Sequence, residues 1–297
     1  MRIFINACQK QKIRFLKLKY YIPSSASVTG RDTTGTQIVD WVGYADDLLL
    51  FFDDEESLCK GIQLLDEIFN RYRLAINVKK TKSMILNNQY RQTDYPPFIA
   101  ELRGEKLDNV VTYRYLGCEV KYDEPTTGEA ELTLRYDAAD TKFYSLSRNI
   151  MNNKIKLKTR TMMLNSLVRS RMVYGSQTWC LTTSQSNKMR STYCGYLRKM
   201  TKGGYRRKEG SWSYVFTNEN LLKMCGTTGI NEYIQKQQKK YVAHLVRRPN
   251  SCIMKQLLFN GNKSRKPGQI ITLLTTVIRN ERCNADDLFK GALERKF

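Results

Sequence analysis

Two adjacent carboxylates stand between apolar segments early in the chain. In the stretch VDWVGYADDLLLFF, residues 39–52, Asp46 and Asp47 follow Tyr44 and Ala45. One aspartate suits a tight turn because its side chain bonds to nearby backbone. Two neighbouring carboxylates repel each other, and a divalent cation would remove that repulsion. Carboxylate oxygens suit Mg²⁺, and two such ions, roughly 3.5–4 Å apart, support phosphoryl transfer. Both the turn and the metal interpretation are open from these residues alone.

The elements around the two aspartates are predicted from the apolar pattern. The segments Ile38–Tyr44 and Leu48–Phe52 read as strands joined by a tight turn, which indicates a β-hairpin. A helix is expected to open at Asp53–Ser57, where Asp54 can cap it and the acids complement the helix dipole. Further strands are predicted at Leu74–Val78, at Ser83–Leu86, and near Phe98–Leu102 and Val110–Val120.

The second half of the chain has helical periodicity. Apolar positions at helical spacing predict helices at Glu131–Met151, Leu157–Val173, Ser186–Met200 and Ile230–Arg247. The basic stretches Lys202–Lys208 and Lys263–Gly268 read as flexible loops. Strands with one helix first, and helices afterwards, predict an α+β protein.

The charge is concentrated in the second half. Residues 1–150 hold 21 Lys or Arg and 21 Asp or Glu, whereas residues 151–297 hold 29 and 7, which gives +22 there. A basic face can simply be solvated, but so lopsided a region would repel itself unless it meets a polyanion. We therefore expect a nucleic-acid partner, with an anionic membrane surface as the weaker alternative.

Cysteine and histidine usage excludes some chemistry. The eight cysteines form no Cys-x-x-Cys pair and His244 is the only histidine, which argues against a zinc finger and against histidine-based catalysis. We expect reduced cysteines and an intracellular location, in the cytoplasm or nucleus, because no signal peptide or membrane-spanning stretch is evident.

Several segments resemble one family in order. Tyr44-Ala45-Asp46-Asp47 resembles the Tyr-x-Asp-Asp box of reverse transcriptases. The segment LAINVKKTKSM (residues 74–84), the sequence Tyr115-Leu116-Gly117 and the segment SRMVYGSQTW (residues 170–179) are similar to segments of LINE-type, non-LTR retrotransposon polymerases. The resemblance covers roughly residues 37 to 260.

The resemblance implies an RNA-directed DNA polymerase and a role for each box. Asp46 and Asp47 would be the catalytic carboxylates and ligands of Mg²⁺. The residues that would contact substrate or primer are Tyr44, Lys80, Lys82, Tyr115, Leu116 and Gly117. Purely structural roles are the alternative. Tyr44 would be an aromatic residue of the strand, Lys80 and Lys82 would be solvated turn residues, and Gly117 would permit a β-bulge. Tyr174 and Trp179 are expected to pack rather than to bind.

The same resemblance implies a division of the chain and its partners. We expect a basic N-terminal segment and loop (1–36), a partial palm with the primer-grip hairpin (37–125), a helical thumb-like region (126–200) and a basic helical C-terminal region (201–297). The partners would be an RNA template, a DNA primer and dNTP, without a membrane. Nucleic-acid contacts are expected from the following residues: Arg169, Arg171, Arg206, Arg207, Lys208, Arg247 and Arg248.

The pattern is incomplete. The family needs a third carboxylate on an earlier strand, and it needs the fingers region of the polymerase, which clamps the nucleotide. Asp32 and Asp40 are the only acids before Tyr44, and neither lies on a strand followed by a helix. We expect a C-terminal fragment that binds Mg²⁺ weakly and is inactive alone, with exposed sheet edge where the missing N-terminal half of the polymerase once packed. The alternative is a catalytically dead nucleic-acid-binding remnant that acts through its basic half.

Overall fold

The computed structural model describes residues 1–86, 100–122, 128–202, 205–208, 211–259 and 272–294. These residues form helices and six two-stranded sheets, five of them antiparallel. The strand pairs lie mainly in the first part of the chain and helices dominate after residue 128, so the predicted α+β class is confirmed. In the described part of the chain, no helix combines the length and the apolar character that a membrane crossing requires.

The first part of the chain contains two helices and most of the strands. Its elements are α1 (Arg2–Lys10), β1 (Leu16–Ile22), a 3₁₀ turn (Ser24–Ala26), β2 (Thr33–Val39), β3 (Trp41–Tyr44), β4 (Asp47–Leu50), α2 (Glu55–Arg71), β5 (Lys82–Ser83), β6 (Glu101–Leu102), β7 (Glu105–Lys106), β8 (Asp108–Asn109), β9 (Thr112–Tyr115) and β10 (Cys118–Lys121).

Helix α2 supports the hairpin of β3 and β4. Asp54 caps α2 as predicted, since its carboxylate accepts a hydrogen bond from the Ser57 amide at 2.9 Å and pairs with Arg14 at 2.9 Å. The apolar face of α2 packs against α1, and both bury Phe4 and Leu65 in one cluster. Leu48 and Leu50 of β4 pack against this cluster, which fixes the inner face of the hairpin.

The second part of the chain is mainly helical. Its elements are α3 (Glu129–Ser145), α4 (Ser147–Ile150), α5 (Leu157–Met163), a π-helical segment (Leu164–Arg169), α6 (Ser170–Met172), a 3₁₀ turn (Ser176–Thr178), α7 (Thr183–Thr201), β11 (Tyr205–Lys208), β12 (Ser211–Tyr214), α8 (Asn218–Cys225), α9 (Ile230–Val246), α10 (Ile253–Leu258), α11 (Leu273–Glu281) and α12 (Ala285–Leu293).

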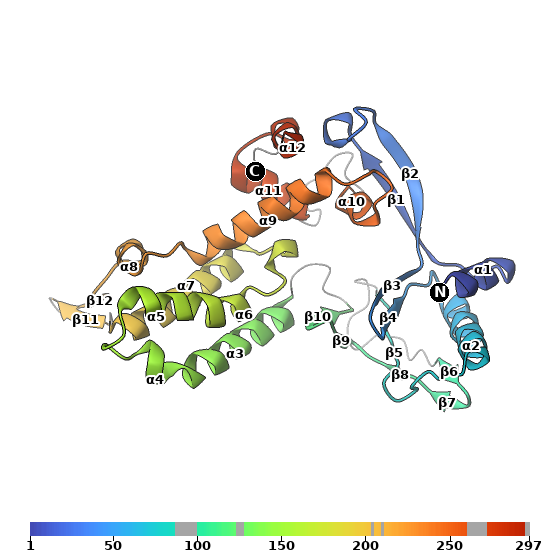
Figure 1. Ribbon diagram of the computed structural model, residues 1–297, viewed down its shortest axis with the longest axis horizontal. Coiled ribbons are helices and arrows are strands. Elements are labelled where there is room, and N and C mark those ends of the chain that lie inside the picture. Colours follow the sequence, from blue (N-terminus) through green and yellow to red (C-terminus); the bar gives the residue numbers. More distant parts are fainter. Residues whose placement is uncertain (87–99, 123–127, 203–204, 209–210, 260–271, 295–297) are drawn as a thin grey trace.

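Two hydrophobic clusters hold this part together. The larger joins α3 and the helical run from α5 to α9, with Phe143 stacked on Tyr196 at a centroid distance of 4.8 Å. In the second cluster, Ile22 and Ala26 from the β1–β2 hairpin pack with Leu288 and Phe289 of α12. Figure 1 shows this hairpin reaching the C-terminal helices α10 to α12, so segments from opposite ends of the sequence share a core.

Two local predictions are wrong, and the strand expected at Ser83–Leu86 is present only at Lys82–Ser83. Leu74–Val78 is not a strand, because Asn77 starts a turn in which its backbone carbonyl accepts from Thr81 at 2.9 Å and its side chain accepts from Lys80 at 3.1 Å. Tyr205–Lys208 is a strand paired with β12 rather than a flexible loop. Residues 263–268, the other basic stretch, lie outside the described residues.

Candidate functional site

The acidic turn closes the hairpin of β3 and β4. Tyr44 pairs with Asp47, so Ala45 and Asp46 form the two-residue turn and Asp47 begins β4. Ala45 has a φ of 53°, whereas Asp46 does not have a positive φ. A positive φ at the first turn position alone is the pattern of a type II′ turn, which matches the twist of a hairpin. Both carboxylates are solvent-exposed and therefore accessible to a ligand.

The donor set fits the simplest kind of magnesium site. Two carboxylates can bind Mg²⁺ when water molecules and substrate phosphates complete the octahedral shell. Within the described residues, no three His, Cys, Asp or Glu side chains cluster in a way that could hold a metal ion. Phosphate oxygens of a bound nucleotide would therefore have to complete any site at Asp46 and Asp47.

The two earlier aspartates have other roles. Asp32 accepts hydrogen bonds from the Tyr21 hydroxyl and the Ser24 amide at the end of the β1–β2 hairpin, and these bonds lower the pKa of its carboxyl. Asp40 accepts from the Trp41 amide at 2.9 Å, in the break between β2 and β3. Each carboxylate thus has local hydrogen-bond donors of its own.

The exposed face of the hairpin is apolar. Every residue of β3 is exposed, with Trp41 at 39%, Val42 at 43% and Tyr44 at 68%. In the described part of the chain, β3 pairs only with β4, so its outer edge presents backbone hydrogen-bonding groups. Tyr44 lies beside the acidic turn, where its ring is free to contact a ligand.

The two predicted turn lysines, Lys80 and Lys82, differ in the contacts that their side chains make. The side chain of Lys82 forms an ion pair with Asp108 and donates to the Lys79 carbonyl at 3.0 Å, which ties the turn to the β5–β8 pair. Lys80 is exposed, and its backbone amide, not its side chain, makes the local turn bonds. Of the two, Lys80 therefore has the more accessible ammonium group.

The second hairpin joins β9 to β10 through Leu116 and Gly117. Both residues have positive φ, 48° and 81°, and Tyr115 pairs with Cys118, which is the pattern of a type I′ turn. Gly117 is favoured there because it has no Cβ, whereas Leu116 adopts a conformation that costs a residue with a Cβ about 1–2 kcal/mol. The Tyr115 hydroxyl is buried and has no hydrogen-bond partner among the described residues.

Side chains from the helical region hold this turn. The Tyr174 hydroxyl donates to the Leu116 carbonyl at 3.0 Å, and Arg135 donates to the Gly117 carbonyl. The Arg135 guanidinium lies over the Tyr174 ring, 4.9 Å from its centroid. Both carbonyls of the turn thereby receive a hydrogen bond from residues that are distant in sequence.

A buried acid completes this arrangement. Glu131 pairs with the Arg135 Nε at 2.6 Å and accepts from the Glu119 amide of β10 at 2.7 Å. We call Glu131, Arg135 and Tyr174 the hairpin clamp. Sequence reasoning missed its two charged members, although a Glu followed four residues later by an Arg in a predicted helix is the usual signal of such a pair. The clamp brings the Tyr115–Gly117 turn and the Tyr174 segment together.

The predicted nucleic-acid contacts are spread over several elements. Arg171 is exposed, and the guanidinium of Arg169 lies over the Tyr233 ring at 4.3 Å. Arg247 donates to the Ala292 carbonyl at 2.9 Å and so ties α9 to α12. Arg206, Arg207 and Lys208 belong to strand β11, which pairs with β12.

One face of α9 carries an exposed basic row. Lys236, Lys240 and His244 follow one another at intervals of four residues, about 6 Å along the helix at each step. Arg248 lies two residues beyond Val246, the last residue of α9, and all four side chains are exposed. We call these four residues the α9 stripe. Arg248 donates from Nε to His244 Nε2 at 3.1 Å. Sequence reasoning missed Lys236, although its helical spacing from Lys240 is the signal that would have found it.

Lys255 is a basic residue that a nucleic acid does not reach. Its fully buried side chain donates to the Val246 carbonyl at 2.7 Å and to the Arg248 carbonyl at 2.9 Å, at the end of α9. Burial lowers the pKa of its ammonium group to about 8.

Comparison with known proteins supports an origin in mobile elements. A Caenorhabditis elegans protein, whose name describes it as uncharacterized and transposon-derived, is 24% identical over 224 residues, which cover 74% of each chain. No family model matches the sequence, and no solved structure is similar to the chain. The similarity indicates a transposon-related protein.

Proposed function

We propose that this chain carries the acidic turn and primer-grip hairpin of an RNA-directed DNA polymerase from a non-LTR retrotransposon. The observation that carries the proposal is the β3–β4 hairpin, which presents Asp46 and Asp47 to solvent beside the exposed ring of Tyr44. The transposon-derived relative supports the same origin.

The residues of the chain have distinct tasks in this proposal. Asp46 and Asp47 bind Mg²⁺ together with the phosphates of a dNTP, and the metal would supply charge stabilisation for attack by a primer 3′-hydroxyl. Tyr44 contacts the nucleotide or the primer end, and Lys80 offers a cation for the phosphates. The β9–β10 turn, held by the hairpin clamp, positions the primer strand. We expect little or no extension by the isolated chain, because the acidic turn supplies two carboxylates and the family needs a third on an earlier strand.

A second candidate function is nucleic-acid binding without catalysis. The excess charge of the second half and the exposed α9 stripe favour it. Phosphate contacts of this kind carry affinity rather than sequence preference, and the binding weakens steeply with salt.

Primer extension, read together with Mg²⁺-dependent dNTP binding, separates the two functions. The chain is incubated with an annealed RNA template, a DNA primer, Mg²⁺ and the four dNTPs. It is compared with Asp46→Asn and with Glu67→Gln, which removes an exposed carboxylate of α2 outside the hairpin. Extension that is lost in Asp46→Asn and kept in Glu67→Gln supports catalysis by the acidic turn. Without extension, Mg²⁺-dependent dNTP binding that is lost in Asp46→Asn and kept in Glu67→Gln supports the acidic turn, whereas salt-sensitive template–primer binding that is identical in all three proteins, without Mg²⁺-dependent dNTP binding, supports the binding function.

A further inference from the structure

The β1–β2 hairpin has one packed face and one outer face. The antiparallel register pairs Leu16 with Val39 and Ile22 with Thr33, and side chains alternate between the two faces along both strands. The packed face buries Leu18 and Ile22, and Ile22 shares a core with α12. Among the described residues, the two strands pair only with each other. Figure 1 shows them as a long two-stranded ribbon between the β3–β4 hairpin and the helices α10 and α12.

The outer face of the ribbon carries ammonium, hydroxyl and hydrocarbon groups and no carboxylate. We call its six residues the ribbon face: Lys17, Lys19 and Tyr21 of β1, and Thr34, Thr36 and Ile38 of β2. All except the half-buried Tyr21 are exposed. The two nearest acids in the sequence, Asp32 and Asp40, lie beyond the ends of β2, where local groups donate to their carboxylates. The ribbon face is therefore suited to an anionic partner.

The dimensions of the ribbon match the major groove of B-form DNA. Each strand has seven residues, which extend over about 20 Å, the length of about six base-pair steps. Successive residues on one face are about 6.8 Å apart, which equals two base-pair steps. The B-form major groove is about 12 Å wide and admits a two-stranded ribbon, whereas the A-form major groove of RNA is too narrow for side chains to read.

The side chains of the ribbon face are of the types that read base edges in that groove. A lysine ammonium donates to the O6 and N7 atoms of guanine, a threonine hydroxyl donates or accepts, and an apolar side chain contacts the methyl group of thymine. The register places Lys17 opposite Ile38 and Lys19 opposite Thr36. Each of these cross-strand pairs therefore offers a cation beside a second group that contacts bases.

Two exposed arginines lie near the distal end of the ribbon. Arg31 belongs to the connection between β1 and β2, and Arg248 ends the α9 stripe. Asn250, two residues after Arg248, donates to Ser27 at 2.9 Å and to Thr33 at 2.8 Å, which fixes the end of the stripe beside the ribbon. Guanidinium groups in these places are available to the phosphates that border the groove.

We propose that the β1–β2 ribbon enters the major groove of B-form duplex DNA, with the ribbon face on the base edges and Arg31 and Arg248 on the flanking phosphates. The surface is distinct from the acidic turn and requires no metal. The packed face keeps its contacts with the C-terminal helices while the outer face binds. A surface that binds phosphates alone gains nothing from an open major groove, so discrimination between duplexes is the property to measure.

Fluorescence anisotropy with three duplexes of the same sequence tests the proposal. The duplexes are DNA, RNA, and DNA whose cytosines carry glucosylated hydroxymethyl groups, which fill the major groove and leave the phosphates unchanged. All titrations use one salt concentration, because phosphate binding depends steeply on salt. We expect the natural chain to bind unmodified DNA at least about 10-fold more tightly than either other duplex, the discrimination of one good base contact. Equal affinity for the three duplexes, or no binding, overturns the proposal.

Two double variants assign the preference to the ribbon. Lys17→Met/Lys19→Met removes both cations of the ribbon face and should lower the affinity for unmodified DNA at least about 10-fold, with loss of the preference. Lys156→Met/Lys158→Met is the matched control, since it removes two exposed lysines at the same spacing beside α5, which lies away from the ribbon in Figure 1. The control should keep the preference. A preference that survives in a folded Lys17→Met/Lys19→Met protein overturns the assignment.

Two other variants separate the ribbon from the acidic turn and from the α9 stripe. Asp46→Asn should leave all three affinities unchanged, so failure at the acidic turn and failure at the ribbon are distinguishable. Lys236→Met/Lys240→Met should weaken all three duplexes by a similar factor and keep the preference, because phosphate contacts carry affinity alone. Loss of the preference in this stripe variant would place the groove contact on α9 and overturn the proposal.

Discussion

Loss of Arg135 should release the β9–β10 hairpin from the helical region. The side chains of Arg135 and Glu131 are 7% and 6% exposed, so Arg135→Met leaves a buried carboxylate without its cation and a turn carbonyl without its donor. Breaking a buried ion pair by removing one partner costs about 3–5 kcal/mol. At about 1.4 kcal/mol for each factor of ten, the lower value corresponds to roughly 100-fold more frequent opening of the hairpin.

Amide hydrogen exchange measures this opening locally. We expect the Glu119 amide, which donates to Glu131, to exchange roughly 100-fold faster in Arg135→Met than in the natural chain. The double variant Glu131→Gln/Arg135→Met should recover part of the protection, because a neutral amide oxygen still accepts from Glu119 without leaving a buried charge.

An exposed ion pair between α3 and α7 is the control for this prediction. Lys188 lies 4.0 Å from Glu129, with side chains 57% and 62% exposed, and such surface pairs contribute little. Lys188→Met should therefore leave exchange in the hairpin almost unchanged. If Arg135→Met has no larger effect than Lys188→Met, the buried clamp does not hold the hairpin and our reasoning about it is wrong.

Three further predictions concern backbone conformation, a buried lysine and the basic helix face. Gly117→Ala should lower the free energy of unfolding by about 1–2 kcal/mol because the φ of residue 117 is 81°. Crowding does not contribute, since the new Cβ would lie 3.6 Å from the Tyr174 ring. Urea denaturation measures the change, and no loss of stability would contradict the conformational argument. Burial lowers the pKa of Lys255 in the folded protein to about 8. Below that pH the ammonium group is charged in both the folded and the unfolded protein, and above it the folded protein releases the Lys255 proton before the unfolded protein does. Stability of the natural chain relative to Lys255→Met should thus rise by about 1–2 kcal/mol between pH 7.5 and 9.5 in urea titrations, and a constant difference would contradict the burial of the charge. Lys236→Met and Lys240→Met should each reduce the slope of log affinity against log salt by about 1 in template–primer binding, and unchanged slopes would exclude the α9 stripe from the interface.

Local signals in the sequence were sufficient for several elements. The acids at residues 53–56 and the apolar spacing that follows predicted α2 and its Asp54 cap. The apolar segments around the acidic turn predicted the hairpin of β3 and β4, although the structure ends β2 at Val39 and starts β3 at Trp41, where the Asp40 side chain accepts from the Trp41 amide. These features depend on residues close together in the chain.

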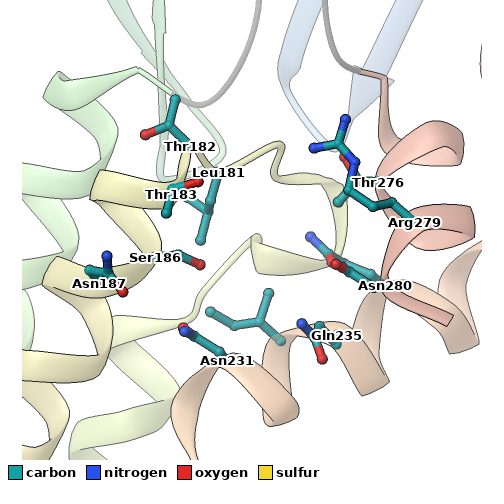
Figure 2. A pocket seen from close by; sticks show the side chains of 12 residues that line it. Leu181, Thr182, Thr183, Ser186, Asn187, Asn231, Gln235, Thr276, Arg279 and Asn280 are labelled. Carbon is teal, nitrogen blue, oxygen red and sulfur yellow. The ribbon is translucent and has the colours of Figure 1, made fainter. Parts of the chain in front are cut away.

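Long-range contacts were not predictable in the same way. The hydroxyl of Tyr174 and the carbonyl of Leu116 are 58 residues apart, and no periodicity in either segment indicates that they meet. The open depression that Figure 2 shows likewise takes most of its lining from α7, α9 and α11. Leu74–Val78 was read as a strand from its apolar residues, but the hydrogen bonds of Asn77 favour a turn. The roles of the individual site residues stay predictions from the resemblance.

Metal binding at the acidic turn tests the proposed function most directly. Mn²⁺ binds to the same oxygen ligands as Mg²⁺ and is detected by electron paramagnetic resonance. In the presence of a dNTP, we predict that the natural chain and Glu67→Gln bind Mn²⁺ and that Asp46→Asn/Asp47→Asn does not. Equal Mn²⁺ binding by all three proteins, or none by the natural chain, would contradict the account.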